Sequence, residues 1–191
     1  MPDLQQSSPP SALFKHCPRC AAARQSEADA VRFVCDACGF TYYYNVAVSA
    51  AVLILDAEGH ALFIRRARDP GRGKLAMPGG FVDRGETAEA AAVREVREEA
   101  GVKLRGVEFL ASFPNLYTYR SVEYPVLDLF FTARVLAREA SPLDDVTEVV
   151  WALPGSLRDE DVAFPSHVNA LRHFAGLQGP GGASGPSSRP T

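Results

Sequence analysis

The pattern of apolar and polar positions predicts several strands. Residues 46–56 form a largely apolar, β-branched run, which is typical of a buried strand. The turn AEGH joins this run to a second strand-like segment at 61–67, so the two segments are expected to form a hairpin. Further strands are predicted at 107–112, 126–136 and 146–152.

Two other segments repeat their apolar residues at helical spacing. Thr87 is a suitable N-cap for the first helix, which is expected to run to Ala100 because Gly101 is a stop signal. The second helix is expected to begin near Ser166. Several strands combined with one central and one terminal helix predict a mixed α+β fold.

Composition divides the chain into two units between polar tails. Residues 1–12 are rich in Ser, Pro and Gln, and residues 178–191 consist mostly of Gly, Pro and Ser, so both tails are expected to be disordered. Residues 13–44 contain all four cysteines, and residues 45–177 contain the periodic apolar segments. The expected organisation is therefore a small cysteine-containing unit followed by one larger domain.

Charge and hydropathy exclude several classes of function. The 191 residues include 20 Lys and Arg against 23 Asp and Glu, a net charge of −3, which is unlike the basic face of a duplex DNA binder. No apolar run reaches the roughly 18–20 residues that a membrane span requires. The first residues also lack the pattern of a secretory signal. A cytoplasmic protein is expected, with no membrane association and no nucleic-acid partner.

The four cysteines form two C-x2-C pairs, separated by fourteen residues. This spacing is typical of a structural Zn²⁺ site, because each short loop presents two thiolates to one tetrahedral ion. Two disulfides would require an oxidising compartment, which the missing signal argues against. With all four positions occupied by cysteine, no coordination position remains for a catalytic water. The predicted zinc ligands are Cys17, Cys20, Cys35 and Cys38.

Acidic residues gather on one side of the first predicted helix. At 100° per residue, Glu95, Glu98 and Glu99 fall within an arc of about 100°, and Glu86 precedes the helix. Like charges at these spacings repel, and the neighbouring arginines are not expected to supply an adequate counter-charge. The pattern indicates a site for Mg²⁺ or Mn²⁺. A solvated acidic helix face is the alternative.

Residues 80–102 resemble the Nudix box, G-x5-E-x7-R-E-U-x-E-E-x-G-U, in which U is a bulky aliphatic residue. The resemblance to the Nudix hydrolases covers residues 45–177 and implies an α/β/α sandwich with a mixed sheet, here preceded by a zinc ribbon. It also implies hydrolysis of a nucleoside diphosphate linked to another moiety. Every defined position of the box is filled, by Gly80, Glu86, Arg94, Glu95, Val96, Glu98, Glu99, Gly101 and Val102.

The resemblance also implies roles for individual residues. Arg94 is expected to orient Glu86 and the preceding turn rather than to contact substrate. One of the metal-binding glutamates, or a carboxylate from a later loop, would accept the proton of the attacking water. Glu148 resembles an acid that is a metal ligand or the base in some family members, and an ordinary exposed acid is the alternative. The implied ligands of Mg²⁺ or Mn²⁺ are Glu95, Glu98, Glu99 and the carbonyl of Gly80.

The segment after the box bears on the substrate. A zinc ribbon before a Nudix domain is similar to the NADH pyrophosphatases, which carry the signature S-Q-P-W-P-F-P-x-S. This chain instead reads ASFPNLYTYRSVEYP, so NADH is not expected to be the best substrate. In this predicted loop, Tyr117, Tyr119 and Tyr124 would stack a nucleobase, cover the site as a lid, or form the surface of a homodimer.

Two further possibilities stay open. The chain is expected to act on a small nucleotide diphosphate, and the alternative is a nucleotide sensor or an RNA-cap-processing protein whose ribbon binds nucleic acid or a partner. Arg65 and Arg66 end a predicted strand, where alternation sends one side chain inward and the other outward. One of the two would reach a phosphate, and the sequence does not indicate which.

Overall fold

The computed structural model describes residues 7–27 and 29–178. The chain forms two compact units: the first comprises Met1–Ala47 and Leu116–Leu127, and the second comprises Val48–Asn115 and Asp128–Thr191. We describe each unit by itself. None of the helices within the described residues has the length and apolar character needed to cross a bilayer.

The larger unit is built on a seven-stranded sheet with the order β5-β4-β3-β8-β7, in which β6 also pairs with β3 and β9 with β4. Two α-helices accompany it, α1 (Ala88–Ala100) and α2 (Pro165–Gln178), with two short 3₁₀ turns, η2 (Pro154–Ser156) and η3 (Asp159–Asp161). The strands are β3 (Ala47–Leu55), β4 (Ala61–Arg66), β5 (Leu75–Ala76), β6 (Gly79–Phe81), β7 (Arg105–Tyr119), β8 (Val122–Arg134) and β9 (Val146–Ala152).

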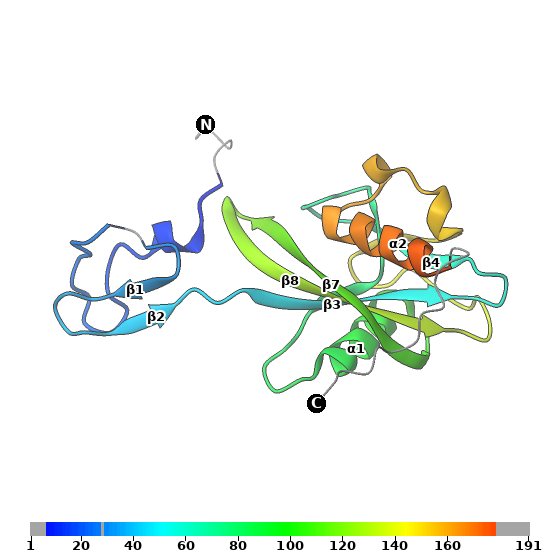
Figure 1. Cartoon of the computed structure of the whole chain (residues 1–191), viewed down its shortest axis with the longest axis horizontal. Coiled ribbons are helices and arrows are strands. Elements are labelled where there is room, and N and C mark those ends of the chain that lie inside the picture. The colour runs from blue at the N-terminus through cyan, green and yellow to red at the C-terminus, as the bar shows by residue number, and fades with distance from the viewer. Residues whose placement is uncertain (1–6, 28, 179–191) are drawn as a thin grey trace, which may run out of the picture. The chain divides into compact units, whose positions relative to one another are not determined.

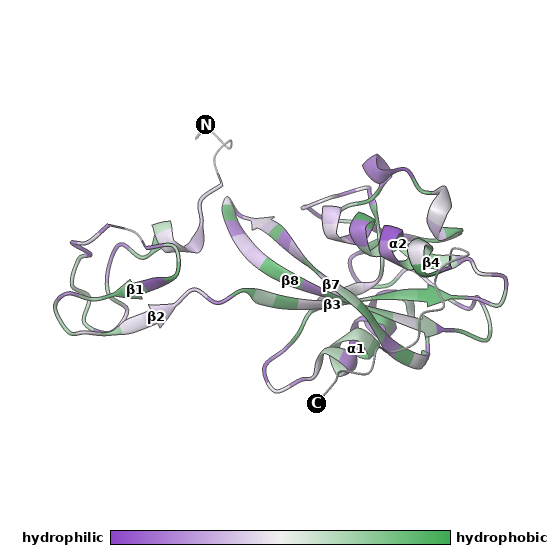
Figure 2. Cartoon of the chain, viewed as in Figure 1, coloured by the Kyte–Doolittle hydropathy of each residue, from purple (hydrophilic) through white to green (hydrophobic). Residues whose placement is uncertain are grey.

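The two helices lie on opposite faces of this sheet (Figure 1). Alternation along β3 explains the layers: Ile54 faces the core that contains Val96 of α1, whereas Leu53 faces the core that contains Leu171 of α2. Both faces of β3 are therefore buried, and the strand is coloured as hydrophobic in Figure 2. The predicted α/β/α sandwich with a mixed sheet is confirmed.

Local sequence signals account for the limits of α1. The hydroxyl of Thr87 accepts a hydrogen bond from the backbone N–H of Ala90 at 3.2 Å. At the other end, Gly101 adopts φ 69° and its N–H bonds to the carbonyl of Arg97. Both predicted caps are confirmed, and they fix where the helix that carries the acidic residues begins and ends.

The segment predicted as a tyrosine-rich loop is instead part of a long hairpin. β7 continues to Tyr119 and β8 begins at Val122, with Arg120 and Ser121 at positive φ in the turn. β7 tolerates Pro114, which has no N–H to donate, because it is the last strand of the sheet order. The prediction of a loop was wrong, because both strands of the hairpin continue through this segment.

The smaller unit contains the cysteines and a two-stranded sheet, β1 (Arg32–Val34) and β2 (Thr41–Tyr43), preceded by the 3₁₀ turn η1 (Pro10–Leu13). The N–H of Ser8 donates to the carbonyl of Ser121, and the N–H of Glu123 donates to the carbonyl of Ser8, both at 3.0 Å. Residues 8–13 thus contain a hydrogen-bonded bridge and a 3₁₀ turn, whereas the sequence predicted disorder up to residue 12. The rest of the predicted tails, at 1–6 and 179–191, lies outside the described residues.

Candidate active site

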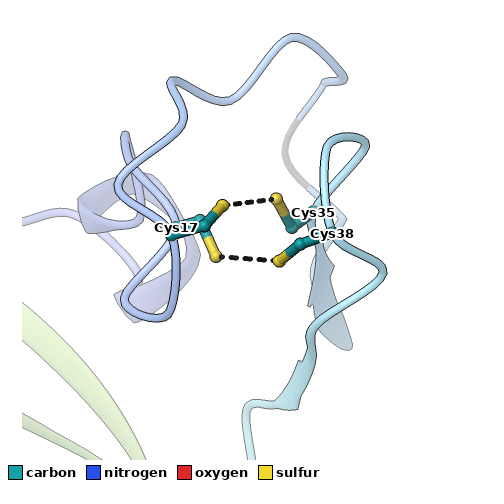
Figure 3. Close-up of side chains that lie close together, drawn as sticks. Cys17, Cys35 and Cys38 are labelled. Carbon is teal, nitrogen blue, oxygen red and sulfur yellow. Dashed lines mark hydrogen bonds between the residues drawn. The ribbon is translucent and has the colours of Figure 1, made fainter.

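The four cysteine sulfurs converge from two loops, as Figure 3 shows. The Sγ atoms all lie within 4.8 Å of one another, with Cys17 and Cys38 at 3.8 Å and Cys20 and Cys35 at 3.6 Å. A tetrahedral Zn²⁺ with Zn–S bonds of about 2.3 Å separates its sulfurs by about 3.8 Å. All four cysteines are free thiols, so the donor set and its spacing fit a zinc ion.

Tight turns hold these sulfurs in place. The N–H of Arg19 donates to the Sγ atom of Cys17 at 3.3 Å, and the N–H of Gly39 closes the second turn on the carbonyl of Cys35. Burial opposes ionisation of Cys17, but hydrogen bonds from the backbone of Cys20 and Arg19 lower its pKa to about 7. These hydrogen bonds favour the thiolate form of Cys17. For Cys20 the backbone of Ala22 also lowers the pKa, but burial and the neighbouring thiols outweigh it and raise the pKa to about 12.

In the larger unit, Glu99 of α1 contacts the backbone of the strand that precedes the helix. The N–H of Gly79 donates to the Oε2 atom of Glu99 at 2.9 Å. Burial nevertheless raises the pKa of Glu99 to about 8. A partly buried carboxylate with one hydrogen bond has little compensation for its lost hydration, so a bound cation would stabilise its charged form.

Gly79 and Gly80 let this backbone approach its neighbours closely. They pair with Ala51 and Ala50 of β3, and a Cβ atom on Gly79 would collide with the backbone there. A Cβ atom on Gly80 would lie 2.5 Å from the Oε1 atom of Glu95. The carboxylate of Glu95 therefore occupies the space directly beside the Gly80 backbone.

Arg94 links the acidic residues of the helix. Its guanidinium donates to both oxygens of Glu86, at 3.0 and 2.9 Å, and its NH1 donates to Glu95 at 2.7 Å and to Glu98 at 3.2 Å. The expected contact with Glu86 is present, and these hydrogen bonds lower the pKa of Glu86. The prediction that the glutamates lack adequate counter-charge was wrong, because the guanidinium of Arg94 contacts both Glu95 and Glu98.

The structure gathers the predicted carboxylates less tightly than the cysteines. Within residues 7–27 and 29–178, the cysteine quartet forms the one group of three or more potential ligands that meets within 4.8 Å. Glu95 and Glu98 contact Arg94, whereas Glu99 contacts Gly79. Glu95 and Glu99 are still close enough for the charge of Glu95 to raise the pKa of Glu99 further. The carboxylates thus share one end of α1 without a common centre.

The comparison with known families covers the whole of this helix. The model of the NUDIX domain matches residues 45–174, which include β6, α1 and the whole acidic cluster. The chain belongs to the Nudix family. The acidic face of α1 therefore lies within the matched Nudix domain.

Several relatives are similar to this Nudix chain. An ADP-ribose pyrophosphatase from Methanocaldococcus jannaschii is 35% identical over 97 residues, which is 50% of this chain and 55% of that protein. An NAD-capped RNA hydrolase NudC from Pseudomonas aeruginosa is 29% identical over 172 residues, 85% of this chain and 55% of the relative. This chain thus spans little more than half the length of these curated relatives.

Among solved structures, a NUDIX hydrolase from Nitrosomonas europaea matches with a TM-score of 0.67 and 26% identity, covering 86% of this chain and 92% of that one. The NUDIX domain of NrtR from Shewanella oneidensis, determined with ADP ribose, matches with a TM-score of 0.59 and 18% identity over 70% of this chain and 89% of the other. The latter similarity shows the fold alone.

Glu148 lies on β9 of the Nudix domain, directly opposite Arg65 of β4. The Nε atom of Arg65 donates to the Oε2 atom of Glu148 at 2.6 Å, and the Glu148 side chain is 53% exposed. In the described part of the chain, no hydrogen bond joins Glu148 to α1. A role for Glu148 as ligand or base would require this ion pair to open, and it stays a prediction.

Sequence reasoning missed a buried polar network behind the Nudix site. The Nδ1 atom of His167 accepts a hydrogen bond from the N–H of Met77 at 3.2 Å, two residues before Gly79. Burial lowers the pKa of His167 to about 4, so the neutral ring is available as an acceptor. Next to it, buried Asp128 accepts from Ser166 at the start of α2. The isolated acid within the apolar run of β8 was the available signal.

The tyrosines of the hairpin lie in the smaller unit. Tyr119 and Tyr124 are exposed, and the guanidinium of Arg120 lies 5.3 Å from the ring centroid of Tyr119. Stacking of a nucleobase, a lid and a dimer surface all remain predictions for these residues. Trp151, in the larger unit, packs partly buried against the core on the α1 side.

Proposed function

We propose that this Nudix hydrolase cleaves a nucleoside diphosphate linked to another moiety, in a reaction that depends on Mg²⁺ or Mn²⁺. Family membership supports hydrolysis of a diphosphate in general. One observation carries the metal-dependent part of the proposal: α1 presents Glu99 and Glu95 to the backbone of Gly79 and Gly80. Hard cations prefer this kind of all-oxygen donor set.

The proposed ligands have distinct tasks. Glu99 is buried and held by the Gly79 N–H, so it would fix the position of an ion with little freedom of its own. Glu95 and Glu98 would give up part of their contact with Arg94 when they bind the ion. The carbonyl of Gly80 would add a neutral ligand. When bound, the cations would offset charge on the diphosphate and lower the pKa of a water.

The residues around the ligands would maintain this geometry during turnover. Arg94 contacts Glu86, Glu95 and the carbonyl of Phe81, and so ties the start of α1 to the end of β6. A glutamate of the helix, or Glu148, would accept the proton of the attacking water. The predicted product is a nucleoside monophosphate, because the metals would sit on the diphosphate that is cut.

The smaller unit would have a structural role. We propose that the four cysteines bind one Zn²⁺ with no position left for water: Cys17, Cys20, Cys35 and Cys38. Residues 13–44 would then form a zinc ribbon that precedes, in the sequence, a Nudix domain at 45–177. A unit of this size has too small an apolar core to fold stably without the ion. Its core consists of a few side chains, including Phe33, Cys17 and Cys35.

A substrate panel tests the proposed reaction. Values of kcat/KM for ADP-ribose, FAD, NAD, NADH and nucleoside triphosphates, each with Mg²⁺, Mn²⁺ or EDTA, should show cleavage within a diphosphate only when metal is present. NADH should not lead, because the signature of the NADH-cleaving relatives is absent from 111–125. A tenfold advantage for NADH would overturn the interpretation of this segment, and metal-independent cleavage would overturn the mechanism.

A second candidate substrate is RNA that carries a nucleotide cap. It is favoured by the similarity to the NudC relative, which extends over 85% of this chain and is named for hydrolysis of NAD-capped RNA. NAD-capped RNA belongs in the same panel beside free NAD. A higher kcat/KM for the capped RNA than for NAD would support contact with the RNA, whereas equal values would leave the small nucleotide as the recognised part.

A further inference from the structure

The chain changes strand partners immediately before the two glycines of the proposed metal site. β5 pairs with β4, whereas β6 pairs with β3. The crossing between them is made by Met77 and Pro78, which belong to neither strand. Pro78 has no N–H, and its carbonyl accepts the N–H of Val52 in β3 at 2.9 Å. The remaining backbone donor of the crossing is the N–H of Met77.

His167, in the first turn of α2, supplies the acceptor for this donor. The N–H of Met77 donates to the Nδ1 atom of His167 at 3.2 Å. Met77 is 2% exposed and His167 is 6% exposed, so water does not provide an alternative acceptor. A buried N–H that has no acceptor is unfavourable, and the crossing therefore depends on this side chain.

The ring of His167 has little freedom to leave this position. Its centroid lies 5.1 Å from that of Phe130, with an interplanar angle of 90°, and 5.3 Å from that of Phe164. The preceding residue, Ser166, donates its hydroxyl to buried Asp128 of β8 at 2.5 Å. Because burial lowers the pKa of His167 to about 4, the ring is neutral at neutral pH and one of its nitrogens is an acceptor.

Two residues after Met77, the backbone reaches the groups that α1 contacts. The N–H of Gly79 donates to the Oε2 atom of Glu99 at 2.9 Å, and Gly80 follows beside Glu95. Only a proline, with its fixed φ, separates Met77 from Gly79. A displacement of Met77 would therefore be transmitted to the N–H that orients Glu99.

The crossing is held by β3 through one carbonyl and by α2 through one histidine, while α1 lies on the opposite face of the sheet. We infer that His167 is a positioning residue of the site. By holding the N–H of Met77, its Nδ1 atom sets the backbone of Gly79 and Gly80 where Glu99 can bind a metal ion. This inference rests on the proposed function, because it concerns the same metal site.

Three substitutions of His167 separate the acceptor from the bulk of the ring. His167→Asn keeps an acceptor near the place of Nδ1, His167→Gln carries its acceptor one bond further out, and His167→Leu has none. Ser166→Ala is the matched control. It removes a buried hydrogen bond from the neighbouring position but leaves the acceptor for Met77, and Asp128 retains its donors from β3 and β7.

Amide hydrogen exchange of Gly79 in metal-free protein measures the inferred link without catalysis. Protection should fall by about 10-fold in His167→Leu and His167→Gln, the effect of one lost hydrogen bond, and should stay near the parent value in His167→Asn and Ser166→Ala. The Kd for Mn²⁺, measured by electron paramagnetic resonance, should follow the same order. Melting temperatures in EDTA record how much general stability each variant loses.

Turnover gives a further readout. On the best substrate of the panel, His167→Leu should lower kcat by about 10- to 100-fold with little change in KM, because a small misplacement of the reacting groups slows the chemical step. His167→Asn should recover most of this loss. Ser166→Ala should keep the parent's kcat even where its melting temperature is lower.

Several results would overturn the inference. Parent-like Gly79 protection and Mn²⁺ affinity in His167→Leu would do so. An equal loss in Ser166→Ala would also do so, since a general loosening of α2 would then explain the effect. The same holds if His167→Asn does no better than His167→Gln. If His167→Leu does not fold, the comparison of the Asn and Gln variants decides in its place.

The failures of the two proposals are distinguishable. If the parent cleaves nothing in the substrate panel but its Mn²⁺ affinity and Gly79 protection depend on the acceptor at His167, the hydrolase proposal fails and the positioning role stands. If the parent cleaves a substrate and His167→Leu keeps the parent's kcat and Gly79 protection, the inference fails alone. A parent protein that neither binds Mn²⁺ nor cleaves a substrate contradicts both.

Discussion

The cysteine cluster and the acidic end of α1 are two candidate metal sites that the chain builds in opposite ways. The sulfurs of the first already stand 3.6 and 3.8 Å apart in pairs, at the spacing a tetrahedral ion requires. The carboxylates of the second are divided between Arg94 and the Gly79 N–H. The cysteines are already arranged for one ion, whereas the carboxylates keep alternative partners.

The difference fits the tasks that we propose for the two ions. A structural ion replaces a hydrophobic core, so its ligands need no second arrangement. A catalytic ion must share its coordination with substrate and water, and its ligands must tolerate that exchange. Arg94 would supply the alternative partner for Glu95 and Glu98. This contrast leads to four predictions, taken from the largest expected effect to the smallest.

Loss of the thiolates should have the largest effect, and it should be confined to the smaller unit. Purified protein should contain one equivalent of zinc by elemental analysis, because structural zinc contributes on the order of 10 kcal/mol to folding. The double variant Cys17→Ser/Cys20→Ser should lose the zinc and hydrogen-exchange protection at 32–43, while β3 and α1 remain protected. A zinc-free parent with a protected β1–β2 sheet would contradict the closed site.

Glu98→Gln should abolish turnover without unfolding the protein. The variant keeps the shape of the side chain but removes a proposed metal ligand, so kcat should fall by about 1000-fold or more. The Glu98 side chain is 44% exposed, so loss of its surface ion pair with Arg94 should change the melting temperature in EDTA little. Glu89→Gln, at an exposed acid in the first turn of the same helix, is the control and should retain activity. If the Glu98→Gln variant were active, Glu98 would not be a metal ligand.

Glu99→Gln should stabilise the metal-free protein in a pH-dependent way. The folded-state pKa of Glu99 is about 8 against an ordinary value of 4.5, so the folded protein holds this proton more tightly than the unfolded chain. The parent should therefore lose stability as pH rises from about 4.5 to 8, by on the order of a few kcal/mol. The amide retains an acceptor for the Gly79 N–H and has no proton to lose.

Denaturant melts in EDTA at several pH values measure this difference. The stability gap between Glu99→Gln and the parent should grow through the window and level off above about pH 8. Added Mg²⁺ should narrow the gap, because the ion stabilises the parent's charged carboxylate. A gap that is independent of pH would mean that Glu99 is not a buried, costly carboxylate.

Gly80→Ala should have the smallest overall effect of the four, a modest loss of stability together with weaker binding of the metal. The added Cβ atom would lie 2.5 Å from Glu95 Oε1, so the flexible carboxylate should shift at a cost of about 1–3 kcal/mol. The Mn²⁺ affinity, measured by electron paramagnetic resonance, should fall. Gly155→Ala is the control, since a Cβ atom there has no neighbour within 4 Å. Equal Mn²⁺ affinity in both variants would show that Gly80 and Glu95 do not bind the ion.

Sequence patterns determined the two candidate sites because both depend on local spacing. The C-x2-C pairs and the positions of Glu95, Glu98 and Glu99 within one helix follow from covalent distance and helical period alone. The caps at Thr87 and Gly101 were equally local, and so was the apolar period that predicted a mixed α+β fold. Each of these features depends on residues within a few positions of one another.

Tertiary structure alone decided the contacts between distant segments. No spacing rule indicated that Arg65 would meet Glu148 across 83 residues, that His167 would accept the N–H of Met77, or that Ser166 would donate to Asp128. The same holds for the continuation of β7 through Pro114, which was possible because the strand lies at the sheet edge. Which polar groups find a partner depends on the packing of segments that the chain brings together only when it folds.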